Sequence, residues 1–213
     1  MDNVLEDIPE LIVRKLNYSK CALFLADKSR RKLLNRASYG FESDNMRAIH
    51  RYSIKLRQNN FLSDVFKYQH PQVVNHLDEI RQSISEQELS FLRQVNAEKF
   101  AVCPIVFKQN GVGLLLADTP VPPRELHQSD INMLMAVVPQ IGIVIDQYFE
   151  KIDEMHIRIE KRLKGIPVAS RYKDMRSTAD KITQTPIDSL VTFFNVLKYS
   201  FGVDPNISKY LEK

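Results

Sequence analysis

The side chains best suited to chemistry in this chain are two cysteines and five histidines. Cys21 and Cys103 both lie inside apolar runs, which predicts buried, reduced thiols, and we expect no disulfide between them. The histidines have no HxxxH spacing and no Cys/His pairing suited to zinc. We therefore expect no metal site at these residues, which are His50, His70, His76, His127 and His156.

Other catalytic motifs are also missing from the sequence. The chain has only six glycines and no glycine-rich loop that could hold a phosphate. Asp27 and Asp118 each follow an apolar run, and a carboxylate in that position usually caps a turn. We therefore expect a protein that is not an enzyme and has no catalytic residues.

Residues 100–147 predict a hairpin followed by a helix. Two apolar runs flank Gln109-Asn110-Gly111, and Asn-Gly is the strongest short-range hairpin signal because both residues tolerate a positive φ. A proline-rich loop follows, and Gln128 or Ser129 begins a long helix. We expect this helix to fold back over the sheet.

Residues 20–36 predict a second hairpin, and its first strand is apolar on both faces. Every residue from Cys21 to Ala26 is apolar, so both faces of the strand are apolar. This is the pattern of a central strand covered on both sides. Before it, residues 2–16 carry a helical apolar stripe. Asp7 and Glu10 around Pro9 resemble a capping signal, which predicts that the regular helix begins there.

In this order and spacing, the segments resemble a GAF domain over residues 1–149. The resemblance is carried by residues 71–75 (Pro-Gln-Val-Val-Asn), Pro104, Gly113 and Asp118. It implies an α+β fold with a central antiparallel sheet, flanking helices and a helical C-terminal extension. The Asn59-Asn60-Phe61 spacing resembles the GAF variety that follows HDOD output domains in bacterial regulators.

The resemblance also implies a small-molecule pocket, although it does not identify a cofactor or ligand. The cyclic-nucleotide signature of some GAF domains cannot be traced here, and neither cysteine suits a bilin. Residues 85–95 predict a capped helix, either a lid over the pocket or a surface helix. Two interpretations of the pocket stay open, a ligand site or a core filled by its own side chains. Its candidate residues are Tyr39, Phe41, Ile54, Phe61, Val65, Phe66, Val74, Cys103 and Ile105.

The segment after residue 141 has the a/d spacing of a coiled-coil seam, which predicts a homodimer. The alternative is a helix that folds back along its own domain. Residues 150–213 are predicted to form a helical extension that faintly resembles the dimerisation hairpin of histidine kinases. Lys181 stands where those kinases have the phosphorylated histidine, so the hairpin would be degenerate. The seam candidates are Ile145, Tyr148, Ile152, Met155 and Ile159.

The preferred interpretation is a non-catalytic sensory or regulatory domain of bacterial-type signal transduction. It would bind a small ligand or a partner, such as a fused or separate output domain, and relay the event through its C-terminal helix. Two alternatives stay open: a ligand-free interaction module of a larger regulator, and a thiol enzyme of the GAF methionine-sulfoxide-reductase type that uses Cys103.

Composition bears on the remaining partners. The net charge of +4 comes from basic residues interspersed with acidic ones, which argues against specific nucleic-acid binding. We found no apolar run long enough to cross a bilayer and expect no membrane partner and a cytoplasmic location.

Overall fold

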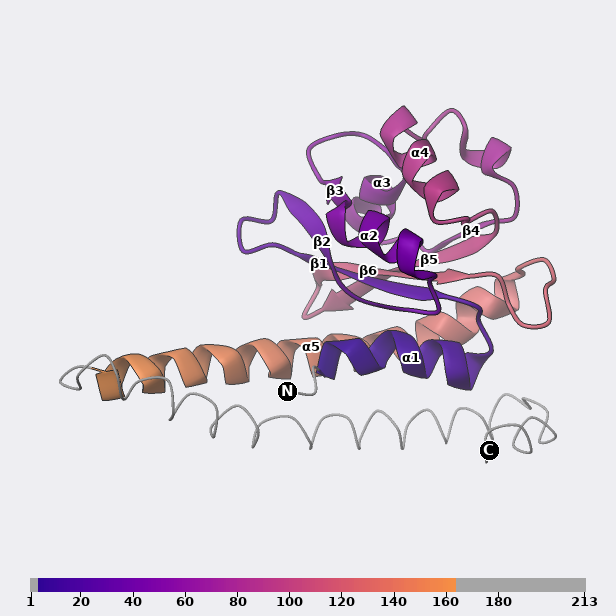
Figure 1. Ribbon diagram of the computed structural model, residues 1–213. Helices are drawn as coiled ribbons and strands as arrows, with labels where there is room; N and C mark the ends of the chain where they lie inside the picture. The colour runs from indigo at the N-terminus through magenta and orange to yellow at the C-terminus, as the bar shows by residue number, and fades with distance from the viewer. Residues whose placement is uncertain (1–3, 164–213) are drawn as a thin grey trace.

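The fold is built on a six-stranded antiparallel sheet with helices on both faces. The computed structural model describes the backbone of residues 4–163 and the side chains of residues 4–151 and 154 (Figure 1). This confirms the predicted α+β class. In chain order the elements are α1 (Val4–Leu16), β1 (Cys21–Ala26), β2 (Lys32–Tyr39), α2 (Ser43–Arg51), β3 (Ser53–Lys55), α3 (Phe61–Tyr68), β4 (Gln72–Val74), the 3-10 helix η1 (Leu77–Ile80), α4 (Glu86–Gln94), β5 (Phe100–Phe107), β6 (Asn110–Asp118) and α5 (Gln128–Leu163).

The strands are arranged in the order β3-β2-β1-β6-β5-β4, so the two predicted hairpins pair through β1 and β6. Helices α2, α3 and α4 cover one face of the sheet, and α1 and α5 cover the other (Figure 1). Each face carries its own buried cluster. We call them the lid-side core, under α2–α4, and the α5-side core, under α1 and α5.

Strand β1 contributes to both cores, as its all-apolar pattern predicted. Cys21, Leu23 and Leu25 belong to the α5-side core. Ala22 and Phe24 belong to the lid-side core. Because successive side chains of a strand point to opposite faces, one central strand couples the two layers.

The two central residues of the turn in the closing hairpin lie two positions earlier than the Asn110-Gly111 pair that the sequence indicated. Lys108 and Gln109 have the positive φ angles, 47° and 66°, and Asn110 already pairs with Phe107 as the first residue of β6. The pairing shifts register after Ile105, and this irregularity moves the turn. The Asn-Gly signal therefore located the hairpin correctly but not its central residues.

Helix α1 begins at Val4 and contains Pro9, so the predicted start near Pro9 is wrong. A proline inside a helix removes one backbone hydrogen bond. Pro9 is nonetheless buried, and Leu5, Ile8 and Ile12 lie in the α5-side core. Burial of each such side chain contributes about 1.5–3 kcal/mol, which is enough to offset that loss.

Helix α5 is longer and more apolar than a surface helix. By length and composition alone its segment Gln128–Lys151 could cross a bilayer, with a mean hydropathy of 1.3, so our expectation of no such run was wrong. Half of that segment is buried, and Leu134, Val138 and Ile141 lie in the α5-side core. This packing accounts for the apolar composition.

The predicted domain boundary at 149/150 falls inside α5, which continues to Leu163. The expected extension therefore begins as a continuation of this helix. Residues 164–213 lie outside the described residues, so the boundary stays a prediction.

Gly113 lets β6 pack closely against β1. A Cβ atom there would overlap the carbonyl oxygen of Phe24 and approach the side chain of Leu25 to 2.7 Å. We predict that Gly113→Ala lowers the free energy of unfolding by about 1–3 kcal/mol, the usual cost of overpacking, measured by urea denaturation. Gly111→Ala is the matched control and should cost less, because its Cβ would meet only the ring of Phe66, a half-buried side chain. Equal costs would contradict this interpretation.

Candidate functional site

The nine pocket residues predicted from the sequence do not gather in one place. Six of them lie in or against the lid-side core, and these are Phe41, Ile54, Phe61, Val65, Phe66 and Val74. The other three lie outside this core, and they are Tyr39, Cys103 and Ile105.

Cys103 and Ile105 belong to the α5-side core, so their assignment to the pocket is wrong. The alternation along β5 places Phe100 and Val102 on the lid side instead. Tyr39 lies against α1, where its hydroxyl oxygen accepts a hydrogen bond from Arg14 Nη2 at 3.0 Å. The Arg14 guanidinium also lies 5.6 Å from the centre of the Tyr39 ring.

The space beneath the lid helices is filled by side chains. Phe24 makes edge-to-face contacts with Tyr52 and Phe91, with ring centres 6.5 and 6.4 Å apart, and Phe61 packs in the same way on Phe100. The enclosed cavity that remains has a volume of about 20 Å³. This is room for about one water molecule. A ligand inside the lid-side core would therefore have to displace aromatic side chains.

Both thiols are free and fully buried. Burial raises the pKa of Cys103 to about 12 and raises that of Cys21 well above its usual value. A nucleophilic cysteine needs a lowered pKa and access to its substrate. Among the residues whose side chains are described, no group of three or more His, Cys, Asp or Glu residues is placed to hold a metal ion.

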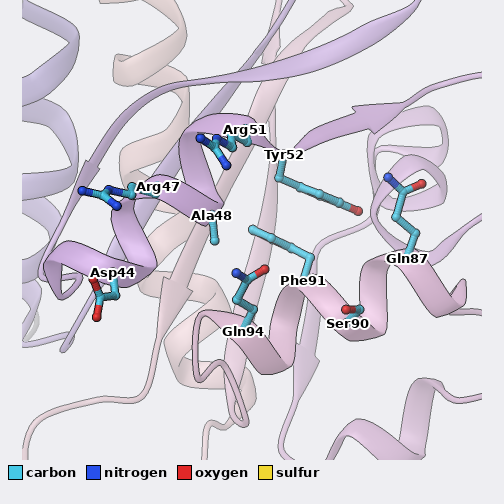
Figure 2. Close-up of a pocket in the computed structure, with 9 residues that line it drawn as sticks. All are labelled: Asp44, Arg47, Ala48, Arg51, Tyr52, Gln87, Ser90, Phe91 and Gln94. Atoms are coloured by element: carbon cyan, nitrogen blue, oxygen red, sulfur yellow. The ribbon is translucent and has the colours of Figure 1, made fainter.

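The larger open space is a groove between α2 and α4, with a volume of about 580 Å³. Figure 2 shows basic side chains on α2, polar side chains on α4 and two aromatic rings between the helices. The rings of Tyr52 and Phe91 are stacked with centres 3.8 Å apart and planes 4° apart. We call this space the α2–α4 groove, and its lining residues are Asp44, Arg47, Ala48, Arg51, Tyr52, Gln87, Ser90, Phe91 and Gln94.

Sequence reasoning did not find this groove. Its α2 wall includes Arg47 and Arg51, which are exposed and four residues apart. That spacing places two side chains on one face of a helix, and it was the available signal. The opposite wall comes from a helix far along the chain, so only the tertiary structure reveals the space between them.

A buried carboxylate attaches the N-terminal end of α4 to α3. Glu88 is 1 % exposed, and its Oε1 accepts a hydrogen bond from the Leu62 backbone N–H at 3.1 Å. Its Oε2 accepts bonds from the Ser85 backbone N–H and hydroxyl, and Ser85 Oγ accepts from the Glu88 N–H in return. This capping box confirms the helix start predicted from residues 85–88 and satisfies the donors of two helix ends.

A lysine attaches the other end of α4 to the sheet. Lys20 Nζ donates to the carbonyl oxygens of Val95 and Asn96, both at 3.1 Å. It also forms a 2.8 Å ion pair with Asp118, whose side chain is 7 % exposed. Because Lys20 precedes β1 and Asp118 ends β6, this contact joins α4 to the two central strands.

The two strand-ending aspartates thus have different roles. Asp27 caps the β1–β2 turn as predicted, because its carboxylate accepts bonds from the Ser29 hydroxyl and the Arg31 N–H at 2.6 and 2.8 Å. The hydrogen bond from Ser29 is the main cause that lowers the pKa of Asp27. Asp118 instead holds Lys20.

The predicted seam meets the described residues only at its beginning. Ile145 is 2 % exposed and lies in the α5-side core, so it has almost no surface for a partner. Tyr148 is half-buried and packs against the same core. The exposed large hydrophobic side chains of α5 are Ile143 and Phe149 within the described residues. The side chains of Ile152, Met155 and Ile159 lie outside the described residues.

Substitution of Glu88 tests the attachment of α4 to α3. We predict that Glu88→Ala lowers the free energy of unfolding at neutral pH by about 1–3 kcal/mol, because it leaves buried backbone donors unpaired. Urea denaturation measures this. Glu86→Ala, an exposed position on the same helix, is the control and should cost less than about 1 kcal/mol.

The stability difference between the wild type and Glu88→Ala should also depend on pH. Burial is the main cause that raises the pKa of Glu88 above its usual value of 4.5, so the folded state binds this proton more tightly than the unfolded state. The stability from that proton is fully present below pH 4.5 and is lost as pH rises through the folded-state pKa. The wild type should therefore gain stability relative to Glu88→Ala as pH falls toward 4.5. A difference that shrinks would contradict the assignment.

Solved structures share this fold at low sequence identity. A GAF domain/HD domain protein from Geobacter sulfurreducens matches with a TM-score of 0.58 at 12% identity, over 68% of this chain and 91% of that one. A domain of a putative two-component sensor histidine kinase from Sinorhizobium meliloti 1021 matches with a TM-score of 0.54 at 17% identity, over 71% and 94%. The blue-light absorbing form of the PixJ GAF domain from Thermosynechococcus elongatus matches with a TM-score of 0.52 at 15% identity, over 72% and 90%.

No curated protein matches the sequence significantly. The sequence profile described as "GAF domain" matches residues 1–146, which is more than half of the chain. The match covers the sheet, both helical layers and the first part of α5. The chain is a member of the GAF domain family.

Proposed function

We propose that this chain is a non-catalytic sensory domain of a signalling regulator. Occupation of the α2–α4 groove, by a small ligand or by part of a partner, shifts α4. The shift passes through the sheet to α5, and α5 carries it to a dimer partner or an output domain. Relay of this kind requires a contact that changes when the groove is occupied, and that change must alter the packing of α5.

The attachment of α4 to the central strands carries this proposal. Lys20 binds the carbonyl oxygens just after α4 and the carboxylate at the end of β6. Strands β1 and β6 then contribute Leu23, Leu115 and Ala117 to the core on which α5 lies. A movement of α4 is therefore transmitted to packed side chains on the far face, which resist small deformations.

The neighbouring structures support a signalling role. By their names, two of them belong to a sensor histidine kinase and to PixJ, whose GAF domain absorbs blue light. We propose a cytoplasmic regulator and retain two finer predictions. One is the GAF variety associated with HDOD output domains. The other is a degenerate kinase-like hairpin at residues 170–201, which lie outside the described residues.

One observation favours the alternative of a ligand-free interaction module. The small cavity in the lid-side core, about 20 Å³, supports a core that is filled by its own side chains. A thermal-shift screen of nucleotides, amino acids and tetrapyrroles separates the two functions. Stabilisation of the protein by any of these compounds favours the sensor. If no compound stabilises the protein, the interaction module is favoured. The thiol enzyme is disfavoured because Cys103 is 0% exposed.

Lys20 tests the relay. We predict that Lys20→Met speeds amide hydrogen exchange at residues 95–97 and also in the part of α5 that lies on the sheet, because Asp118 is left buried without its partner. The measurement is hydrogen exchange with mass spectrometry, interpreted against the global stability of each variant.

Lys108→Met is the matched control for this experiment. Lys108 pairs with Asp146 of α5 directly, but at 3.6 Å and with a lysine side chain that is 70% exposed. Such a surface pair contributes only about 0–1 kcal/mol. If the effect of Lys20→Met is confined to residues 95–97 while α5 is unchanged, the relay is refuted.

The predicted seam gives a test of dimerisation. We predict that the full chain is a homodimer and that the double variant Ile152→Lys, Ile159→Lys is a monomer, because charges at two successive equivalent positions of the seam oppose coiled-coil packing. Light scattering coupled to size-exclusion chromatography measures the mass. Ile143→Lys, a 37% exposed position of α5 outside the seam row, is the control and should remain a dimer. A monomeric wild type, or a dimer lost only in the control, would rule out this seam.

A further inference from the structure

The α2 wall of the α2–α4 groove carries two cations without an anionic partner. Arg47 and Arg51 are both exposed, and no ion pair to either of them occurs among the described side chains. Side chains four residues apart are neighbours on a helix surface, and like charges at this spacing destabilise the helix slightly. An anion held between the two guanidinium groups would remove that repulsion. Asp44 is the only acidic side chain that lines the groove.

The floor of the groove contains a parallel stack of Tyr52 and Phe91, and both rings make edge-to-face contacts with Phe24. Each ring covers one face of the other, and Phe91 is only 5% exposed. The stack is therefore fixed by the lid-side core and offers the groove an apolar contact surface, not an open aromatic face. An apolar group of a ligand would be buried against this surface.

The α4 wall is polar but uncharged. Gln87, Ser90 and Gln94 line it, and Figure 2 shows them on the helix across from the two arginines. Amide and hydroxyl groups donate and accept hydrogen bonds without favouring either charge sign. The charge selection in the groove therefore comes from α2, and the α4 side offers hydrogen bonds that can fix an orientation.

We propose that the α2–α4 groove binds a small molecule that carries a carboxylate or phosphate on a largely apolar body. The anionic group pairs with Arg47 and Arg51, whose guanidinium geometry matches both anions. The apolar body lies against the Tyr52–Phe91 stack. The volume of about 580 Å³ is within the usual range of small-molecule sites. This proposal rests on the proposed function and names the ligand class of the same groove.

Three probes of one shape test the charge requirement in the full 213-residue chain. They are 2-naphthoate, 2-naphthyl phosphate and the neutral 2-naphthamide, each measured by isothermal titration calorimetry. We expect at least one anion to bind about tenfold more tightly than the amide, as charge-assisted hydrogen bonds predict. The better of the two anions identifies the carboxylate or the phosphate arm. Equal affinities, or binding of a hexaglutamate peptide but of none of the probes, would overturn the proposal.

The double variant Arg47→Ala, Arg51→Ala should weaken the preferred anion about tenfold or more and leave 2-naphthamide unchanged. Arg93→Ala is the matched control, since Arg93 is an exposed arginine of α4 that does not line the groove. Circular dichroism and urea denaturation confirm that the variants fold. If Arg93→Ala weakens binding as much as the double variant does, the site lies elsewhere.

The two proposals fail separately. Hydrogen exchange with the preferred anion bound reports on α5. Tight anion binding with unchanged exchange in α5 would retain the ligand class and refute the relay. An effect of Lys20→Met on α5 together with no anion binding would retain the relay and refute the ligand class.

Discussion

The pairing of β1 with β6 is the interaction on which the rest of the structure depends. It joins the first and last hairpins into one sheet, from Cys21 opposite Ala117 to Leu25 opposite Gly113. Two separate hairpins would each be marginally stable in water. Once paired, the central strands present apolar side chains on both faces, and each helical layer has a surface on which to pack. The lid, the groove and the course of α5 all follow from this.

Polar contacts determine where α4 lies on that sheet. Apolar packing alone is non-directional and would tolerate several positions of a short helix. Glu88 fixes one end of α4 to α3, and Lys20 fixes the other end to β6. Because buried polar groups are costly when unpaired, these contacts favour a single arrangement. The groove between α2 and α4 is a consequence of that arrangement.

The sequence was sufficient for the fold because its signals were local and periodic. The apolar run Cys21–Ala26 and the capping box at Ser85 both identified elements that the structure contains. The sequence was insufficient to predict which residues line the candidate site. A strand that is apolar on both faces does not reveal which face meets which helices, and Cys103 was therefore placed on the wrong side. Arg47 and Arg51 have helical spacing, but the significance of that pair depends on a helix distant in the chain.

The borders of the sheet have a consequence of their own. Its outer strands, β3 and β4, have only three residues each, and β3 ends in the exposed Lys55. Strand β5 extends beyond the residues that pair with β4, and there it contains Pro104, which has no N–H to donate. Short, charged or donor-poor borders are poor templates for adding a strand from another molecule. Fibril-like growth through the sheet is thereby discouraged.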